Sequence, residues 1–357
     1  MRRGAAMVWR LACKLHAPIV MLRHLGYVAI ARSLDISTGQ TCRLRHATPE
    51  RLRALIEANL VNLRRVLEFN AANAIWLYRI SSDLVPFASH PVNQLAWWDE
   101  FGALLADIGA YVRRHRMRVS MHPGQFTVLN SLSPAVVRAA IDEVVWHARL
   151  LDALGVDTTA KIVIHVGGLV DGREPAIARF VATVRDLPDA VRRRLIVEND
   201  ERLFTAEDVL EVSRATGLPV VFDWLHHRAN PGTARTPADI RRVVTRCFAT
   251  WGPADGVPKI HLSSQARGAR PGRHADWVRV TDLLVFLAVA PRRTFDCMIE
   301  AKEKELALFR LRRDLARHDV RERGARPAAG RSSASRAAER RPVSPAPRPE
   351  RGRVSAA

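Results

Sequence analysis

Histidine and acidic side chains recur along this chain where short apolar stretches end. One such stretch, residues 118–121, runs directly into His122, and others end at or shortly before similar side chains. Imidazole suits Zn, Mn, Fe and Co, and carboxylates can bridge paired ions. No cysteine accompanies the set, which argues against a structural zinc knot. The remaining members are His90, His165, Glu198, Asp223, His226, His261, His274 and Glu300.

Each of these residues alone has an ordinary explanation, because a single strand-end histidine is usually a loop residue and a single acid can cap a helix. The set is harder to explain in this way. Burying so many ionisable groups at one place is costly unless metal ions or hydrogen bonds compensate. Asp223 and His226 stand three residues apart across a predicted strand-to-helix turn, so both could contact the same ions. The pattern predicts a divalent metal centre.

The chemistry expected of such a centre is hydrolysis of a phosphodiester. Neighbouring divalent ions can activate a water and stabilise a leaving oxygen. The chain carries a net charge of +20, which favours a polyanionic partner such as nucleic acid. A sugar isomerase remains an alternative, because it would use a similar metal pair on a small polyhydroxy substrate.

The elements that must position these residues alternate strand with helix eight times, from a strand near residues 24–31 to a helix near 302–317. The strands are continuous apolar runs, which indicates burial on both faces in a parallel sheet. This predicts an α/β fold, a single-domain (β/α)8 TIM barrel, in which all strand ends meet on one face. Helices are expected at 93–115 and 274–287. A doubly wound sheet has no support, since no GxGxxG follows the first strand.

The turn after residue 121 brings two further side chains to the same face. Pro123 cannot continue a strand, and Gly124 permits a positive φ, so a sharp turn is predicted there. Gln125 and Phe126 then lie at the strand end, next to His122.

The ends of the chain differ in composition from its middle. We expect an N-terminal extension at 1–22 that precedes a natural start, a barrel domain at 23–316, and a disordered Arg/Pro/Ala/Ser-rich tail at 317–357. Four scattered cysteines indicate reduced thiols and a cytoplasmic protein. No apolar run approaches the roughly 20 residues of a membrane span.

Several short motifs, in this order, resemble the UV damage endonuclease family over about residues 21–316. The wider relatives of that family are the endonuclease IV and xylose isomerase-like barrels. The motifs are Leu25-Gly26-Tyr27, Tyr78-Arg79-Ile-Ser-Ser82, His122-Pro-Gly-Gln125, Ile164-His165-Val-Gly-Gly168, Glu198-Asn199-Asp200, Phe222-Asp223-Trp-Leu-His226-His227 and Lys259-Ile-His261-Leu-Ser-Ser264.

The resemblance implies an ATP-independent DNA repair endonuclease that uses no nucleotide cofactor. Such enzymes nick double-stranded DNA immediately 5′ to cyclobutane pyrimidine dimers, 6-4 photoproducts and some other lesions. About two or three divalent ions, usually manganese, are implied. We expect a monomer that acts on nucleoid DNA. The implied catalytic residues are Lys259, Glu198 and His226, and the implied metal ligands are His90, His122, His165, Glu198, Asp223, His226, His261, His274 and Glu300.

The same resemblance implies which residues contact DNA. Gln125 and Phe126 match the pair that the family inserts into the duplex at a lesion, where a damaged base pair costs less to open. Tyr27 and Tyr78 are candidate pocket residues, with core packing as the alternative. Arg267 and Arg270 are candidate phosphate contacts, with solvated loop charges as the alternative. A damaged-DNA binder without catalysis is a further hypothesis.

Overall fold

Eight short strands close into a parallel barrel. The computed structural model describes residues 21–323. Each strand pairs with the next one along the chain, and β1 pairs with β8, so the order of the strands in the barrel is their order in the sequence. The predicted (β/α)8 fold is confirmed. The strands are β1 (Leu22–Val28), β2 (Leu77–Arg79), β3 (Arg118–Met121), β4 (Lys161–His165), β5 (Leu195–Glu198), β6 (Val220–Asp223), β7 (Lys259–Leu262) and β8 (Phe295–Ile299).

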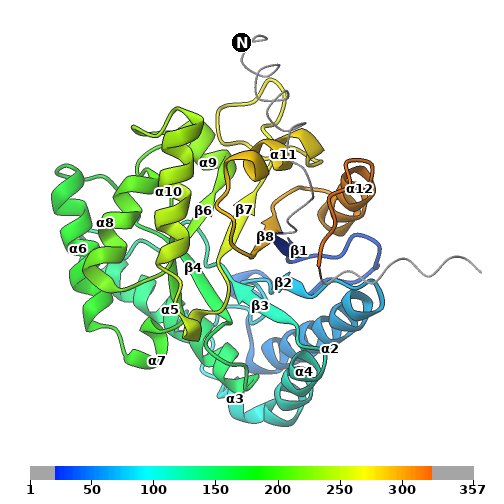
Figure 1. Ribbon diagram of the computed structural model, residues 1–357. Helices are drawn as coiled ribbons and strands as arrows, with labels where there is room; N and C mark the ends of the chain where they lie inside the picture. The colour runs from blue at the N-terminus through cyan, green and yellow to red at the C-terminus, as the bar shows by residue number, and fades with distance from the viewer. Residues whose placement is uncertain (1–20, 324–357) are drawn as a thin grey trace, which may run out of the picture. The chain divides into compact units, whose positions relative to one another are not determined.

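Helices cover the outside of the strands (Figure 1). Several start at signals present in the sequence: Thr48 caps α2 with a proline next to it, and Thr205 and Thr236 form capping boxes. Within residues 21–323, no helix combines the length and apolar character that a membrane crossing requires. The helices are α2 (Pro49–Ala72), α3 (Trp97–Glu100), α4 (Gly102–Arg114), α5 (Pro134–Ala153), α6 (Arg173–Asp186), α7 (Asp189–Arg192), α8 (Ala206–Thr216), α9 (Trp224–Ala229), α10 (Pro237–Ala249), α11 (Val280–Val289) and α12 (Lys304–Ala316), with 3-10 turns η1 (Leu44–His46) and η2 (Pro253–Asp255).

Two helices differ from the sequence prediction. The stretch 93–115 forms α3 and α4, with a break at Phe101 before the poor helix former Gly102. The helix expected from residue 274 begins only at Val280, because His274 instead forms an isolated antiparallel bridge with Gln265. The loop after β7 is therefore longer than predicted, and it reaches over the end of the barrel where the strands finish.

An ionic network closes the opposite, amino-terminal end of the barrel. Asp296 on β8 accepts hydrogen bonds from Arg23, at 2.6 Å, and from Arg118, at 2.9 Å. Burial opposes ionisation of Asp296, but the two guanidinium groups hold its pKa below the usual range. In the β7–β8 register Asp296 lies beside Lys259. The barrel interior therefore contains a buried charged layer beneath the candidate site.

The ordered chain continues beyond α12 into residues 317–323, which the composition assigned to the tail. The carboxylate of Glu322 is buried, accepts from the backbone amide of Leu25 at 2.7 Å and pairs with Arg312 at 2.8 Å. These contacts explain why the chain stays packed after residue 316. The rest of the predicted tail, and residues 1–20 of the predicted extension, lie outside the described residues.

Candidate metal centre

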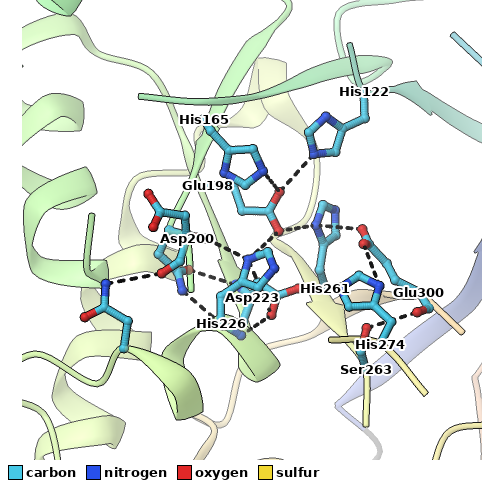
Figure 2. A network of polar contacts seen from close by, with 12 residues as sticks. His122, His165, Glu198, Asp200, Asp223, His226, His261, Ser263, His274 and Glu300 are labelled. Carbon is cyan, nitrogen blue, oxygen red and sulfur yellow. Dashed lines mark hydrogen bonds and ion pairs between the residues drawn. The ribbon is translucent and has the colours of Figure 1, made fainter. Parts of the chain in front are cut away.

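The carboxyl ends of the strands bring the predicted ligands together. His165, Glu198 and Asp223 are the last residues of β4, β5 and β6, and His122 and Glu300 directly follow β3 and β8. Because all eight strands are parallel, these side chains meet at one end of the barrel. Figure 2 shows them pointing toward one another around Glu198.

Glu198 lies at the centre of the cluster and is 1% exposed. One carboxylate oxygen, Oε2, lies 3.2 Å from His122 Nε2 and 3.6 Å from His165 Nε2. The other, Oε1, lies 2.7 Å from His261 Nδ1 and 3.7 Å from His226 Nδ1. A single carboxylate thus faces imidazoles from four different strand ends.

The remaining ligand candidates extend the cluster to both sides. His226 lies in α9, immediately after β6, and its backbone amide donates to Asp223 Oδ1 at 2.7 Å. Its Nδ1 lies 3.8 Å from the same oxygen. On the other side, Glu300 lies 3.2 Å from His261 Nδ1 and 3.7 Å from His274 Nδ1. The predicted closeness of Asp223 and His226 is therefore present.

The two central glutamates have opposite electrostatic environments. Burial raises the pKa of Glu198 well above its usual range, and the nearby charges of Glu300 and Asp223 add to the effect. Burial also disfavours the charge of Glu300, but Arg79 and the neighbouring imidazoles hold its pKa well below the usual range. The charged form of Glu198 is thus unfavourable without a further cation, and a bound metal ion would stabilise it.

The donor set fits divalent ions. Two groups each place one ligand atom per residue within 4.8 Å of one another: His122, His165 and Glu198, and Glu198, Asp223 and His261. All donors are imidazole nitrogen or carboxylate oxygen, as borderline and hard divalent ions prefer. Asp223 Oδ2 is buried without a hydrogen-bond partner among the described residues, which is costly unless something else binds it.

His90 is the one predicted ligand that the structure does not bring into this cluster. Its side chain is exposed in the loop after β2, where its Nδ1 accepts from the backbone amide of Val92 at 3.1 Å. Its ring packs edge-on against Phe87. A ligand role for His90 would need this loop to move, and it stays a prediction.

Two buried cations adjoin the cluster, and only one was predicted. Lys259 is 1% exposed, so it is not a solvated lysine although it stands at a strand start. Burial, with help from Arg118 and Arg79, lowers its pKa well below the usual range. Arg79, at the end of β2, was not predicted to have a role. Its Nη2 lies 2.6 Å from Glu300 Oε1 and 2.7 Å from His261 Nε2.

A cavity of about 340 Å³ opens above the cluster. Two of the residues predicted to contact DNA, Gln125 and Arg270, line this cavity. Phe126, next to Gln125 in the chain, is 72% exposed. Arg267 is exposed in the same loop as Arg270. The prediction missed three polar residues at this rim, because neither spacing nor periodicity distinguishes them from ordinary loop residues: Glu201, Arg273 and Lys302.

Tyr27 and Tyr78 lie in the core, which is the alternative that the sequence left open for them, and not in the substrate pocket. Both are almost completely buried, and their ring centres lie 5.2 Å apart. The Tyr27 hydroxyl bonds to Asn70 Oδ1 at 2.9 Å, and the Tyr78 hydroxyl donates to the backbone carbonyl of Ala29. With both rings packed and both hydroxyls satisfied by protein, neither can contact a substrate in this structure.

The turn after β3 is formed differently from the prediction. Among the described residues with positive φ, Gly124 is absent, so the turn does not need the left-handed conformation. The Phe126 ring instead occupies the space beside it: a Cβ on Gly124 would lie 2.3 Å from Cε1 of Phe126. The start of the turn is fixed separately, because Ser82 Oγ donates to the backbone carbonyl of His122 at 2.5 Å.

His147 on α5 supports this turn from below and predicts a pH dependence of stability. Its ring is fully buried, with Nε2 3.0 Å from Ser82 Oγ. Burial lowers its pKa to about 3 from 6.5. The unfolded chain then binds more protons between these values, so the free energy of unfolding falls as pH drops through this window, by up to about 1.4 kcal/mol per pH unit from this residue.

Urea unfolding of His147→Gln and wild-type protein in EDTA, at pH values from about 4.5 to 7, measures this contribution. The variant should show a shallower dependence on pH than the wild type. Parallel profiles would show that His147 does not resist protonation in the folded state.

Comparisons of the sequence with known proteins agree with one another. A family model described as UV-endonuclease UvdE matches residues 17–326. The UV DNA damage endonuclease of Bacillus cereus (strain G9842) is 35% identical over 301 residues, which are 82% of this chain and 94% of that protein. The protein of the same name from Clostridium perfringens (strain 13 / Type A) is 32% identical over 287 residues, covering 80% of this chain and 69% of that one.

Solved structures also resemble the chain. The crystal structure of SacUVDE has a TM-score of 0.77 at 35% identity and covers 83% of this chain and 99% of that one. The apo form of 3-keto-D-glucoside 4-epimerase, YcjR, from E. coli has a TM-score of 0.51 at 10% identity, covering 82% and 99%. The second likeness concerns the barrel fold alone.

Proposed function

Because this chain belongs to the UV-endonuclease UvdE family, we propose that it is an endonuclease that incises DNA at UV damage. The observation that carries the proposal is the buried cluster around Glu198, which opens into a cavity with Arg270, Arg273 and Lys302 at its rim. We further propose that the cut lies immediately 5′ to cyclobutane pyrimidine dimers, 6-4 photoproducts and other helix-distorting lesions. The protein is proposed to act on DNA in the cytoplasm and to be a monomer.

The metal centre is proposed to hold about two or three divalent ions, with manganese as the expected metal. Divalent ions at this place would polarise the scissile phosphodiester and acidify an attacking water. The donor chemistry and the unsatisfied oxygen of Asp223 support such a centre. The proposed ligands are His122, His165, Glu198, Asp223, His226, His261, His274 and Glu300, with His90 retained from the family resemblance.

The protein's own cations are proposed to bind and orient the phosphate backbone. Arg270 and Arg273 stand at the rim of the cavity, where phosphates would arrive first, and Arg267 lies exposed in the same loop. Lys259 lies deeper and is fully buried. It would therefore contact only the innermost phosphate, or it would offset the negative charge of Glu198 and the neighbouring carboxylates. Glu198, His226 and Lys259 are the proposed catalytic residues.

Gln125 and Phe126 are proposed to recognise the lesion. A photodimer stacks and pairs poorly, so opening the duplex there costs less than elsewhere. The exposed ring of Phe126 can stack into the resulting gap, and the Gln125 amide can pair with the orphaned bases. Phe126 is the most exposed large apolar side chain among the described residues, so its ring can reach a duplex without leaving the core. The sugar isomerase alternative gives no role to this exposed ring.

The decisive experiment compares nicking of UV-irradiated and unirradiated supercoiled plasmid, with Mn²⁺ or with EDTA. We expect nicking only of irradiated plasmid and only with the metal. End-labelled duplexes with one defined lesion then locate the cut. Nicking that persists in EDTA would contradict the metal centre. Binding of irradiated DNA without cleavage under any divalent ion would favour a non-catalytic binder, and turnover of an aldose without DNA cleavage would favour an isomerase.

A further inference from the structure

Large apolar side chains are exposed mainly on the loops that follow the strands, on the same end of the barrel as the candidate site. Leu169 and Val170 stand out because they are adjacent, 38% and 48% exposed, in the loop between β4 and α6. Polar residues would normally occupy such a loop, and adjacent exposed aliphatic residues suggest a partner. The other exposed residues in these loops are Ile30, Leu44, Phe126, Leu132 and Trp277.

The backbone under Leu169 and Val170 is held rigidly. Asn130 donates from Nδ2 to the carbonyl of Gly168 at 2.7 Å and accepts from the amide of Gly168 at 3.0 Å. Arg179 on α6 donates to the carbonyl of Val170 at 2.7 Å and to that of Asn130 at 3.0 Å. The loop therefore does not depend on its apolar side chains for its shape.

Residues with positive φ stand on both sides of Leu169 and Val170. Gly167 has φ +112°, and a Cβ there would lie 2.4 Å from Asn130 Oδ1, so only glycine permits this approach. Asp171 has a φ of 60°, which non-glycine residues adopt uncommonly. Asp171 thus carries backbone strain directly after the pair, whereas Gly167 adopts its conformation without a steric cost.

The loop that carries the pair is hydrogen-bonded to the loop that carries Phe126. Leu169 is four residues from His165, which limits their separation to roughly 14 Å. Phe126 is likewise four residues from His122, and the rings of His122 and His165 are 5.2 Å apart. Asn130 belongs to the loop that carries Phe126, so its bonds to Gly168 join the two loops directly.

We propose that Leu169 and Val170 form a second apolar wedge that packs against DNA bases and sugars opened at the lesion. This inference rests on the proposed function. Proteins that bend or open DNA commonly insert leucine, isoleucine or phenylalanine between base steps, which requires an apolar side chain on a rigid support. The cationic rim at Arg270 and Arg273 supplies the phosphate contacts that would hold the duplex over both wedges.

The test replaces both residues at once, as Leu169→Ser with Val170→Ser. The hydrogen bonds of this loop use backbone carbonyls and amides, so the loop should keep its shape. Val61→Ser is the matched control, because Val61 is 45% exposed on α2, on the outside of the barrel. Affinity for a duplex with one photodimer and for the undamaged duplex is measured by fluorescence anisotropy with Ca²⁺ in place of Mn²⁺. A 2-aminopurine next to the lesion reports base unstacking.

We expect the double variant to bind the damaged duplex about tenfold more weakly and to produce less 2-aminopurine fluorescence at saturation. Binding of undamaged DNA, the melting temperature and the metal content should match those of wild type and Val61→Ser. Unchanged affinity of the double variant for the damaged duplex would overturn the proposal. It would also be overturned if sedimentation showed that the substitutions only weaken self-association of the protein and leave DNA binding unchanged. If wild type itself did not distinguish the two duplexes, the proposed function would fail first, and the proposal with it.

Discussion

Replacing Glu198 by glutamine is expected to reduce nicking of UV-irradiated DNA by at least about a thousandfold. Glutamine has the same shape, but it removes the one charge that faces His122, His165, His226 and His261 together. The amide is a poor bridging ligand and cannot balance divalent charge. The loss should therefore come from the metal centre and not from the fold.

The stability of the same variant gives an independent readout. Burial raises the pKa of Glu198, so at pH 7 placing this carboxyl in the core costs the metal-free folded protein free energy that the unfolded chain does not lose. Glutamine removes this cost. In EDTA the variant should therefore melt at the wild-type temperature or above it. Added Mn²⁺ should raise the melting temperature of wild type and have a much smaller effect on the variant, because binding to the folded state stabilises it.

Glu211→Gln provides the control. It makes the same chemical change at an exposed glutamate on α8, away from the site. It should nick, bind Mn²⁺ and melt as wild type does. A Glu198→Gln protein that kept full nicking, or the full stabilisation by Mn²⁺, would show that Glu198 is not the centre of the metal site.

The barrel and most of the cluster could be predicted because both depend on local patterns that repeat. Each strand is a continuous apolar run, and each ligand candidate occupies the position where a strand ends, so a parallel closed sheet forces His165, Glu198 and Asp223 to one place. His90 was the exception. It follows its strand after a long loop, and the course of a long loop depends on contacts such as that with Phe87, which no periodicity encodes.

The residues that sequence reasoning missed act through contacts between distant segments. Arg79 at the end of β2 reaches Glu300 after β8, and Ser82 reaches the carbonyl of His122. Both stand in motifs of the family, but nothing in their spacing shows which neighbour they contact. Tyr27 was left open by the sequence, since an aromatic side chain beside a strand end fits either a pocket or the core, and its hydroxyl is satisfied by Asn70 inside the core.

Gly124 shows how the structure changes the reason for a residue without changing its importance. The sequence suggested that Gly124 permits a positive φ, but its φ is not positive and the Phe126 ring lies where a side chain would be. The ring lies against the turn and remains 72% exposed, so it rests there without being buried. The conformation of the Phe126 side chain therefore depends on the absence of a side chain at Gly124.

Substituting Gly124 by alanine is accordingly expected to displace the Phe126 ring and to reduce the preference for damaged over undamaged DNA by about tenfold or more. The new Cβ would lie 2.3 Å from Cε1 of Phe126, and this exposed ring can move away at little cost in stability. Because φ at Gly124 is not positive, alanine should leave the melting temperature unchanged or slightly raise it. Mn²⁺ binding should also persist, since Ser82 holds the carbonyl of His122 independently.

Gly102→Ala is the matched control, because a Cβ at Gly102, at the start of α4, meets nothing within 4 Å. Relative nicking rates on damaged and undamaged duplexes, with metal content and melting temperature for each variant, separate recognition from the metal centre. Loss of Mn²⁺ binding in Gly124→Ala would mean that the turn also sets the position of His122. Full retention of lesion preference would mean that the resting position of the Phe126 ring is irrelevant to recognition, and that the ring reaches the duplex equally well from any starting conformation.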